Sequence, residues 1–194
     1  MATLFRSTLN SRWLPTGEDF RFIRSDFPRA LTDEEVQSLL RNNVRTIIDL
    51  RGPAECLHAP CRLEKEAGFV YLHRPVSVPG GVPSNQEQFA ALYEAMVDDE
   101  LEKIVNAAIT APTRVLFFCG SGQDRTGVVS AAILKELGYD DETIVEDYMK
   151  TKENLQPVLE AMAKEHPEID LELFLPHEEN IKIALEALKK RKTK

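Results

Sequence analysis

Apolar residues along the chain recur at two spacings, one typical of buried strands and the other typical of amphipathic helices. Short runs rich in β-branched and aromatic residues predict strands. They lie at Phe20–Arg24, Val44–Leu50, Phe69–Arg74 and Arg114–Phe118, and the last of these is the most apolar. Each run is short enough to cross a sheet once, so we expect a sheet of at least four strands.

Between these runs the apolar residues change to a spacing of three and four, which predicts helices. One helix is expected to open at the capping box Thr32-Asp-Glu-Glu35 and to stop at Asn42-Asn43. A second capping box, Ser84-Asn-Gln-Glu87, precedes an apolar stripe whose members are Phe89, Leu92, Tyr93, Met96 and Val97. The stripe repeats from Leu101 to Ile109, until Pro112 prevents its continuation.

The second half of the chain is expected to be mainly helical. Residues 126–137 are apolar around much of the helix circumference and are followed by Gly138, which predicts a buried helix. Further helices are expected near residues 141–150, 155–164 and 178–190. Strands that alternate with helices predict an α/β fold. We therefore expect residues 1–194 to form a single domain, in which helices cover both faces of a mostly parallel sheet of four to five strands.

Composition and charge limit the partners. The 194 residues are 43% hydrophobic, which is enough for such a core. Lys and Arg number 24 against 32 Asp and Glu, so the net charge is −8 and nucleic acid is not an expected partner. No window approaches the ~20 apolar residues of a membrane span, so stable membrane insertion is not expected either. Three cysteines, an odd number, predict a reducing, cytoplasmic location and at least one free thiol.

The chemistry is concentrated between the strand at residues 114–118 and the helix at residues 126–137. This segment reads Cys119-Gly-Ser-Gly-Gln-Asp-Arg125-Thr126 and follows the end of a strand, where α/β sheets bind ligands. Gly120 and Gly122 allow a tight turn in which successive N–H groups converge on one point. The helix N-terminus adds its own N–H groups and positive pole, and Arg125 adds a planar fork for two phosphate oxygens. Such a site favours the thiolate form of a cysteine, and Thr126 is expected to place its hydroxyl near the sulfur.

Cys119-x5-Arg125-Thr126 resembles the signature of the cysteine-dependent protein tyrosine phosphatase superfamily. The stretch CGSGQDRTG is most similar to bacterial tyrosine and lipid phosphatases whose loop reads close to HCTAGKDRTG. Upstream, Phe22-Ile-Arg-Ser25 and the segment from Arg45 to Glu55, which contains Asp49-Leu-Arg51, resemble the same family. The resemblance covers roughly residues 20–154.

The resemblance implies a tyrosine-phosphatase-like fold and hydrolysis in two steps. Cys119 would attack phosphorus, while Arg125 and the loop residues Gly120, Ser121, Gly122 and Gln123 hold the phosphate oxygens. Water would then hydrolyse the phosphocysteine, and neither a metal nor a cofactor is needed. The substrate would be a phosphorylated protein or a small phosphomonoester.

Two residues depart from the family pattern: Phe118 stands where a His is usual, and Gln123 stands where a Lys is usual. Loss of the His can make the loop less rigid, and loss of the Lys removes a cation that would face a highly charged inositol ring. Three functions therefore stay open. The first is a phosphotyrosine-type or dual-specificity phosphatase, the second is a phosphoinositide phosphatase, and the third is a phosphate-binding pseudophosphatase.

The general acid has more than one candidate. Asp124 lies in the loop, in a GxDR arrangement that resembles myotubularin-type lipid phosphatases, and it also suits a structural role at a helix start. Asp98 and Asp99 lie upstream of the cysteine, as the acid of larger tyrosine phosphatases does, and equally resemble a helix cap. Of these we choose Asp124.

Several other side chains follow the strand at residues 44–50. Arg51 and Glu55 are expected at the same rim as Cys119, where Arg51 would contact substrate, support the loop or pair with Glu55. Cys56, His58 and Cys61 lack a fourth ligand for zinc, so no metal site is expected. Cys56 either packs in its loop or forms a protective disulfide on oxidation. The sequence does not indicate an oligomeric state.

Overall fold

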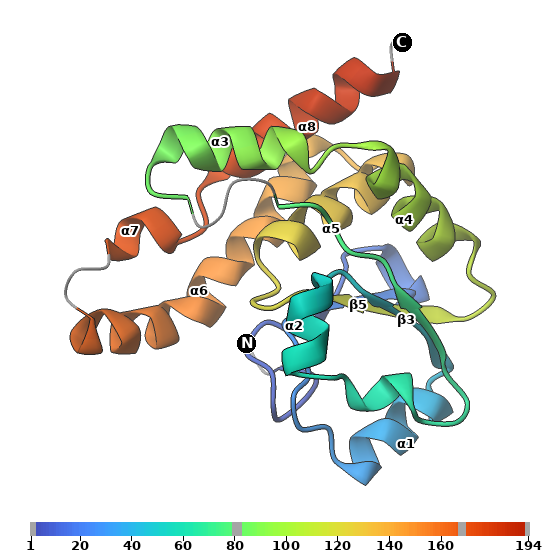
Figure 1. Cartoon of the computed structure of the whole chain (residues 1–194). Helices are drawn as coiled ribbons and strands as arrows, with labels where there is room; N and C mark the ends of the chain where they lie inside the picture. The colour runs from blue at the N-terminus through green and yellow to red at the C-terminus, as the bar shows by residue number, and fades with distance from the viewer. Residues whose placement is uncertain (1–2, 79–82, 167–169, 193–194) are drawn as a thin grey trace.

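A five-stranded sheet lies at the centre of the computed structural model, which describes residues 3–78, 83–166 and 170–192 (Figure 1). The strand order is β1-β2-β5-β3-β4, and β1 alone pairs antiparallel with its neighbour. The sheet therefore confirms the expected mostly parallel arrangement. The strands are β1 (Arg12–Trp13), β2 (Phe22–Ser25), β3 (Val44–Asp49), β4 (Val70–His73) and β5 (Arg114–Phe118).

Eight α-helices accompany the sheet in the described part of the chain. They are α1 (Asp33–Arg41), α2 (Pro53–His58), α3 (Gln86–Ala95), α4 (Asp99–Thr110), α5 (Asp124–Glu136), α6 (Asp141–Glu165), α7 (Leu171–Phe174) and α8 (Glu178–Lys192). Two 3-10 turns, Gly17–Asp19 and Arg62–Glu64, complete the regular structure. Within these residues no helix is both long and apolar enough to cross a membrane.

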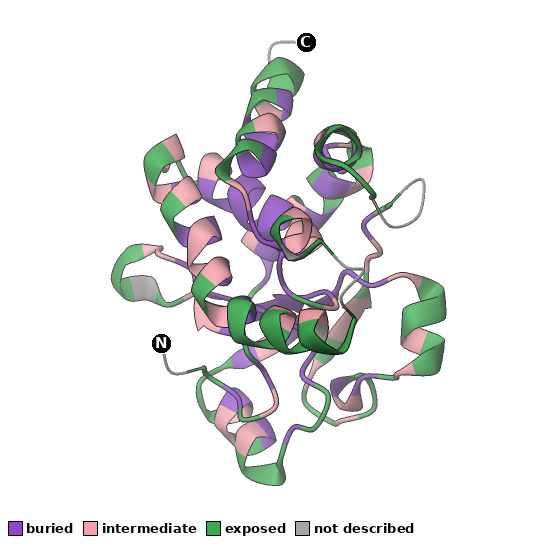
Figure 2. Ribbon diagram, turned by 90° about the vertical axis from the view of Figure 1, so that its left-hand side faces the viewer, coloured by how far each residue is buried: buried purple, intermediate pink, exposed green. Residues whose placement is uncertain are grey.

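The sheet separates two hydrophobic cores, because successive side chains of a strand point to opposite faces. Val115 and Phe117 of β5 belong to the larger core, which contains buried residues of α3, α4, α5 and α8. Leu116 and Phe118 belong to the smaller core with α1. Figure 1 shows α1 on one side of the sheet and these four helices on the other, and Figure 2 shows the buried residues gathered at the centre, where β2, β3 and β5 lie. Helices on both faces were expected, and the structure confirms them.

Local signals for helix ends were mostly correct. Thr32 and Glu35 form the predicted capping box, and Asn43 has a positive φ of 57° after α1. The second box is shifted by one residue, because Asn85 rather than Ser84 caps α3 by accepting a hydrogen bond from the Gln88 amide at 2.9 Å. Asn is as good an N-cap as Ser, so the sequence did not separate these neighbours.

Other differences concern short and interrupted elements. Residues 141–165 form one helix that continues through Pro157, where two helices were expected. A proline interrupts only one backbone hydrogen bond and can be tolerated when packing favours the helix. β1 and α7 are too short for a periodic pattern, whereas Pro53 at the first turn of α2 was a usable signal that we missed.

The register of the three central strands places the loop residues together. Ser25 at the end of β2 and Asp49 at the end of β3 both pair with Phe118 at the end of β5. The three strands are parallel, so the residues that follow them emerge at one edge of the sheet. Asp26, Arg51 and Cys119 are therefore neighbours although they are far apart in the sequence.

The structure predicts a purely structural role for Asp98. Its carboxylate caps α4 by accepting a hydrogen bond from the Leu101 amide at 2.9 Å. We expect Asp98→Ala to lower the free energy of unfolding by about 1 kcal/mol, measured by urea denaturation, because one helix N–H loses its partner. Turnover of an aryl phosphate should not change. A large loss of turnover with unchanged stability would instead make Asp98 part of the site.

Candidate active site

Cys119 follows the last residue of β5 directly and is 1% exposed. Residues 119–123 form a loop that leads straight into the N-terminus of α5 at Asp124. Above the loop lies a cavity of about 760 Å³, whose lining includes Gly120, Ser121, Gln123, Asp124 and Arg125. The structure thus brings together the strand end, the loop and the helix N-terminus that the sequence predicted.

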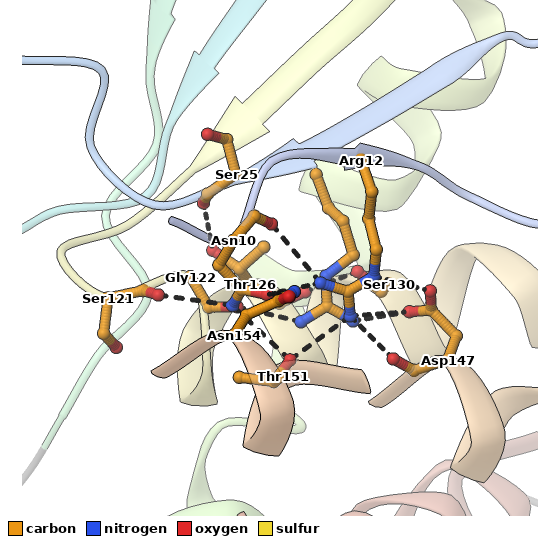
Figure 3. Close-up of polar contacts among 11 residues, drawn as sticks. Asn10, Arg12, Ser25, Ser121, Gly122, Thr126, Ser130, Asp147, Thr151 and Asn154 are labelled. Carbon is orange, nitrogen blue, oxygen red and sulfur yellow. Dashed lines mark hydrogen bonds and ion pairs between the residues drawn. The ribbon is translucent and has the colours of Figure 1, made fainter. Parts of the chain in front are cut away.

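The carbonyl oxygens of Ser121 and Gly122 are bonded to side chains that are not among the described residues lining this cavity. The Asn10 side-chain amide donates to the carbonyls of Ser121 at 3.3 Å and Gly122 at 3.0 Å, and Figure 3 shows these contacts. Arg24 also donates to the Gly122 carbonyl at 2.8 Å, and the Phe27 amide donates to the Gly120 carbonyl at 3.1 Å.

These contacts determine where the loop amides point. In a trans peptide, the C=O of one residue and the N–H of the next point in opposite directions. The described part of the chain contains no cis peptide bond. The N–H groups of Gly122 and Gln123 are therefore directed away from Asn10 and Arg24, and that of Gln123 donates to the Ser121 hydroxyl at 3.4 Å. Converging amides next to a helix N-terminus form a site suited to an anion.

An ion-pair cluster behind the loop supports Asn10 and Arg24. Asp147 of α6 contacts Arg24 at 2.6 Å and Arg12 at 3.0 Å, and its side chain is only 2% exposed. Burial alone would raise the pKa of Asp147, but the charges of Arg24 and Arg12 outweigh it and hold this pKa below its usual value. Arg12 in turn bonds to Asn10, and Asn154 donates to the Asn10 side-chain oxygen at 3.1 Å (Figure 3). The cluster thereby connects the N-terminal segment and α6 to the loop.

Sequence reasoning missed this supporting cluster. Asn10 and Arg12 lie before the region of family resemblance, and Asp147 lies on a helix far along the chain. Arg24 was part of the Phe22–Ser25 segment that resembles the family. That segment was the available signal, but it did not reveal what the arginine touches.

Arg125 is held by a carboxylate from α2. Its two terminal nitrogens contact the two oxygens of Glu55 at 2.5 and 2.9 Å. Hydrogen bonding to Arg125 lowers the pKa of Glu55. The guanidinium is thereby fixed beside Gly120, where an added Cβ would lie 3.6 Å from both Arg125 and Glu55. The sequence placed Glu55 at this rim correctly, but its partner is Arg125 and not Arg51.

Arg51 is not among the described residues that line the cavity, and its expected contact with substrate stays a prediction. The residue is 2% exposed, and its guanidinium donates to both oxygens of Asp49 and to the Ala59 carbonyl at 2.8 Å. It also lies 3.7 Å from the ring centre of Phe27 and 5.5 Å from that of Phe118. The side chain follows β3 to the correct edge of the sheet but turns inward to its carboxylate partner. Phe118, which replaces the usual His, therefore lies in a packed layer with Phe27 and Arg51.

Asp124 has the surroundings expected of a proton donor. It is half-buried, lines the cavity, and accepts a hydrogen bond from the Tyr93 hydroxyl at 2.7 Å. Burial raises its pKa above the ordinary value for an aspartate. The other two candidates lie elsewhere: Asp98 caps α4, and Asp99 pairs with Arg191 at an exposed position.

Gln123 and Thr126 use their side chains for internal contacts. The Gln123 amide donates to the Phe174 carbonyl at 3.2 Å, which attaches the loop to α7. The Thr126 hydroxyl donates to the Ser25 carbonyl at 3.5 Å and is fully buried. A role of Thr126 toward the Cys119 sulfur stays a prediction, as do the substrate contacts of the loop residues.

The three cysteines are unpaired thiols. The Cys56 sulfur lies 3.5 Å from Asp49 and 3.4 Å from His73, and burial raises its pKa to about 11. These contacts match the packing interpretation of Cys56, and a disulfide with Cys119 on oxidation stays a prediction. Among the residues described, no group of His, Cys, Asp and Glu is placed to hold a metal ion.

Gly122 provides a test of the loop geometry. It has a φ of +69°, and a Cβ there would lie 2.6 Å from the Asp26 amide nitrogen. We expect Gly122→Ala to displace the loop and lower kcat/KM on an aryl phosphate by roughly 10²-fold. Gly138→Ala is the matched control, because Gly138 also has a positive φ of +85° but open space around it. Equal activity of the two variants would contradict the proposed loop geometry.

Comparison with known structures gives the same fold. PTPMT1 in complex with PI(5)P is 18% identical, with 95% of this chain and 97% of that chain covered and a TM-score of 0.53. Human DUSP28 is 14% identical, with 99% of each chain covered and a TM-score of 0.51. The human tyrosine phosphatase-like serine/threonine/tyrosine-interacting protein is 13% identical, with 94% and 95% covered and a TM-score of 0.50. At these identities the likeness is one of fold.

Sequence comparison identifies the family. A search of curated protein sequences found no match. The model of the tyrosine phosphatase family, however, matches residues 17–192, which include the whole sheet from β2 onward, the Cys119 loop and the helices that follow it. This chain belongs to the tyrosine phosphatase family.

Proposed function

We propose residue roles for this chain, which by its family is a cysteine-dependent phosphatase. Cys119 is the nucleophile, Arg125 and the loop amides bind the phosphate, and Asp124 is the general acid. The observation that carries this proposal is the loop itself: its carbonyls are held from behind by Asn10 and Arg24, directly before the N-terminus of α5. That arrangement leaves a positive concavity beside a cysteine in an otherwise acidic protein.

In the first step, the Cys119 thiolate forms a bond to phosphorus while the bond from phosphorus to the leaving oxygen breaks. The electron pair goes to that oxygen, and the Asp124 carboxyl group gives it a proton. In the second step, the Asp124 carboxylate takes a proton from water as the water attacks phosphorus. The phosphorus–sulfur bond breaks, which releases phosphate and regenerates the thiolate.

The environment of Asp124 supports this assignment. A general acid must hold its proton near neutral pH, and burial raises the pKa of Asp124 in the required direction. The neighbouring Arg125 acts in the opposite direction because its charge stabilises the carboxylate. The second step needs the carboxylate form. Burial, which favours the protonated form, therefore suits the first step, and the charge of Arg125, which favours the carboxylate, suits the second.

The cavity walls support a substrate with one phosphate on an apolar or aromatic body, as in phosphotyrosine. Most lining side chains are apolar, and the lining residues described include only two cations, Arg29 and Arg125. Asp26 adds a carboxyl group to the wall. Exposed Arg29 favours phosphoinositides as a second candidate, since it can contact an additional phosphate. The apolar lining residues are Leu9, Phe27, Val78, Pro83, Phe89, Leu92, Leu155, Val158, Leu159 and Phe174.

We also propose a reducing location such as the cytoplasm. The three thiols are free, and a phosphatase of this type needs an unoxidised cysteine. The proposed partners are phosphorylated proteins or small phosphomonoesters.

Hydrolysis should be measured on an activated aryl phosphate, phosphotyrosine and phosphoserine peptides, and a phosphoinositide panel. We expect Cys119→Ser to abolish turnover of every substrate. Asp124→Asn should reduce kcat/KM for the phosphotyrosine peptide by about 10²–10⁴-fold, because kcat/KM reports the first step and a poor leaving group needs the proton there. The loss of kcat/KM on the activated aryl phosphate should be much smaller, while kcat should fall on both substrates because hydrolysis of the intermediate is common to them.

Asp99→Asn is the matched control, because it neutralises an exposed carboxylate that pairs with Arg191. It should leave turnover unchanged. Equal losses of kcat/KM on both substrates with Asp124→Asn would overturn the acid assignment. No hydrolysis at all, with tungstate still bound, would make the chain a phosphate-binding pseudophosphatase.

A further inference from the structure

Two tyrosine hydroxyls are buried in the larger core, where phenylalanine would fill the same space. Tyr93 of α3 is 0% exposed and Tyr148 of α6 is 1% exposed, and both belong to a cluster of apolar side chains. A buried hydroxyl costs free energy unless it is hydrogen-bonded. The partners of these two hydroxyls therefore indicate why they are present.

The two hydroxyls form a short hydrogen-bonded chain that ends on Asp124. The Tyr93 hydroxyl lies 2.7 Å from Asp124 Oδ1 and 2.6 Å from the Tyr148 hydroxyl. A tyrosine has one hydroxyl proton to donate. Since Tyr93 donates its proton to Asp124, Tyr148 must donate to Tyr93. The two hydrogen bonds thus have one direction, with Tyr148 donating to Tyr93 and Tyr93 donating to the carboxyl group of Asp124.

The packing of α5 leaves room for Tyr148 in this hydrogen-bond network. A Cβ at Gly127 would lie 2.9 Å from two ring carbons of Tyr148, so only a glycine lets Tyr148 approach α5 this closely. The two tyrosine rings also meet edge to face, with centres 6.2 Å apart and an interplanar angle of 89°. Tyr148 is thus packed against both α5 and the Tyr93 ring, which limits how far the two hydroxyls can turn away from Asp124.

We propose that Tyr93, supported by Tyr148, is a positioning residue that holds the Asp124 carboxyl group in the orientation for proton donation. The proposal rests on the proposed role of Asp124 as general acid. Both side-chain hydrogen bonds to Asp124, from Tyr93 and from the Gln123 amide at 3.5 Å, end on Oδ1. The proton of the acid form is therefore carried on Oδ2, the oxygen left for the leaving group.

The Tyr93 hydrogen bond also affects when Asp124 loses its proton. Burial raises the pKa of Asp124, while donation from Tyr93 stabilises the carboxylate and lowers it. Charged groups on the neighbouring elements are Arg125 on α5, Glu55 of α2 beyond it, and Arg24 of β2 near Tyr148. None of these changes when the Tyr93 hydroxyl is removed. Loss of that hydroxyl should therefore raise the pKa of Asp124.

The test compares Tyr93→Phe with the unaltered protein on a phosphotyrosine peptide and on an activated aryl phosphate, over a range of pH. We expect kcat/KM on the peptide to fall by about tenfold, which is part of the contribution of a general acid, with little change of kcat/KM on the aryl phosphate. The rate on the peptide falls as Asp124 loses its proton. A raised pKa therefore moves the alkaline limb of the profile to higher pH in the variant.

Two further variants make the result specific. Tyr139→Phe is the matched control, since Tyr139 is a partly buried tyrosine packed against the same core, and it should change neither the rate nor the pH profile. In the Asp124→Asn background, Tyr93→Phe should cause no additional selective loss, because the group that it positions is already absent.

Equal losses on both substrates, or an unmoved alkaline limb, would overturn the role of Tyr93. If Asp124→Asn alone still lowers kcat/KM more on the peptide than on the aryl phosphate, the proposed function survives that result. If Asp124→Asn lowers kcat/KM equally on both substrates, the acid assignment and this inference both fail. Inactivity of Cys119→Ser would still identify the nucleophile in either case.

Discussion

The site depends on one constraint: the carbonyl oxygens of the loop after Cys119 must be held away from the cavity. Carbonyls that faced a phosphate dianion would repel it, and their outward orientation is what directs the N–H groups inward. Asn10 and Arg24 satisfy this constraint by donating to the Ser121 and Gly122 carbonyls. Asp147 in turn keeps Arg24 in place, and breaking a buried ion pair of this kind costs about 3–5 kcal/mol. The N-terminal segment, β2 and α6 thus support the proposed phosphate site, although none of them carries the proposed nucleophile.

The local charge of the site is opposite to that of the whole protein. The chain has a net charge of −8, yet the loop gathers backbone amides, a helix N-terminus and Arg125 at one point. Carboxylates around the loop are paired or hydrogen-bonded: Glu55 to Arg125, and Asp26 to the amides of Leu9 and Asn10. Burial raises the pKa of both Asp26 and Asp124, and Asp124 is the one that begins α5 beside Arg125. A small positive site within an acidic surface suits one phosphate group on a body that contacts apolar walls.

The sequence was sufficient for the fold and the loop, since both depend on local patterns. Periodic apolar residues located four of the five strands, and the spacing from Cys119 to Arg125 located the loop proposed to bind phosphate. The pairing of Arg51 with Asp49 was not predicted, because the position of a residue after a strand gives the edge of the sheet but not the direction of its side chain. Tyr93 was correctly placed in the core by its helical spacing. Its hydroxyl partner was not predictable, because α3 and Asp124 meet only in three dimensions.

Trapping the reaction intermediate tests the central claim most directly. In Asp124→Asn, attack on an activated aryl phosphate needs no acid, whereas hydrolysis of the intermediate lacks its base. Rapid denaturant quenching during turnover, followed by mass spectrometry of the peptide that contains Cys119, should therefore show one phosphoryl group on the Cys119 sulfur. Two results would contradict the account: a phosphoryl group found on a residue other than Cys119 during turnover, or turnover with no phosphoryl group on Cys119 at any quench time.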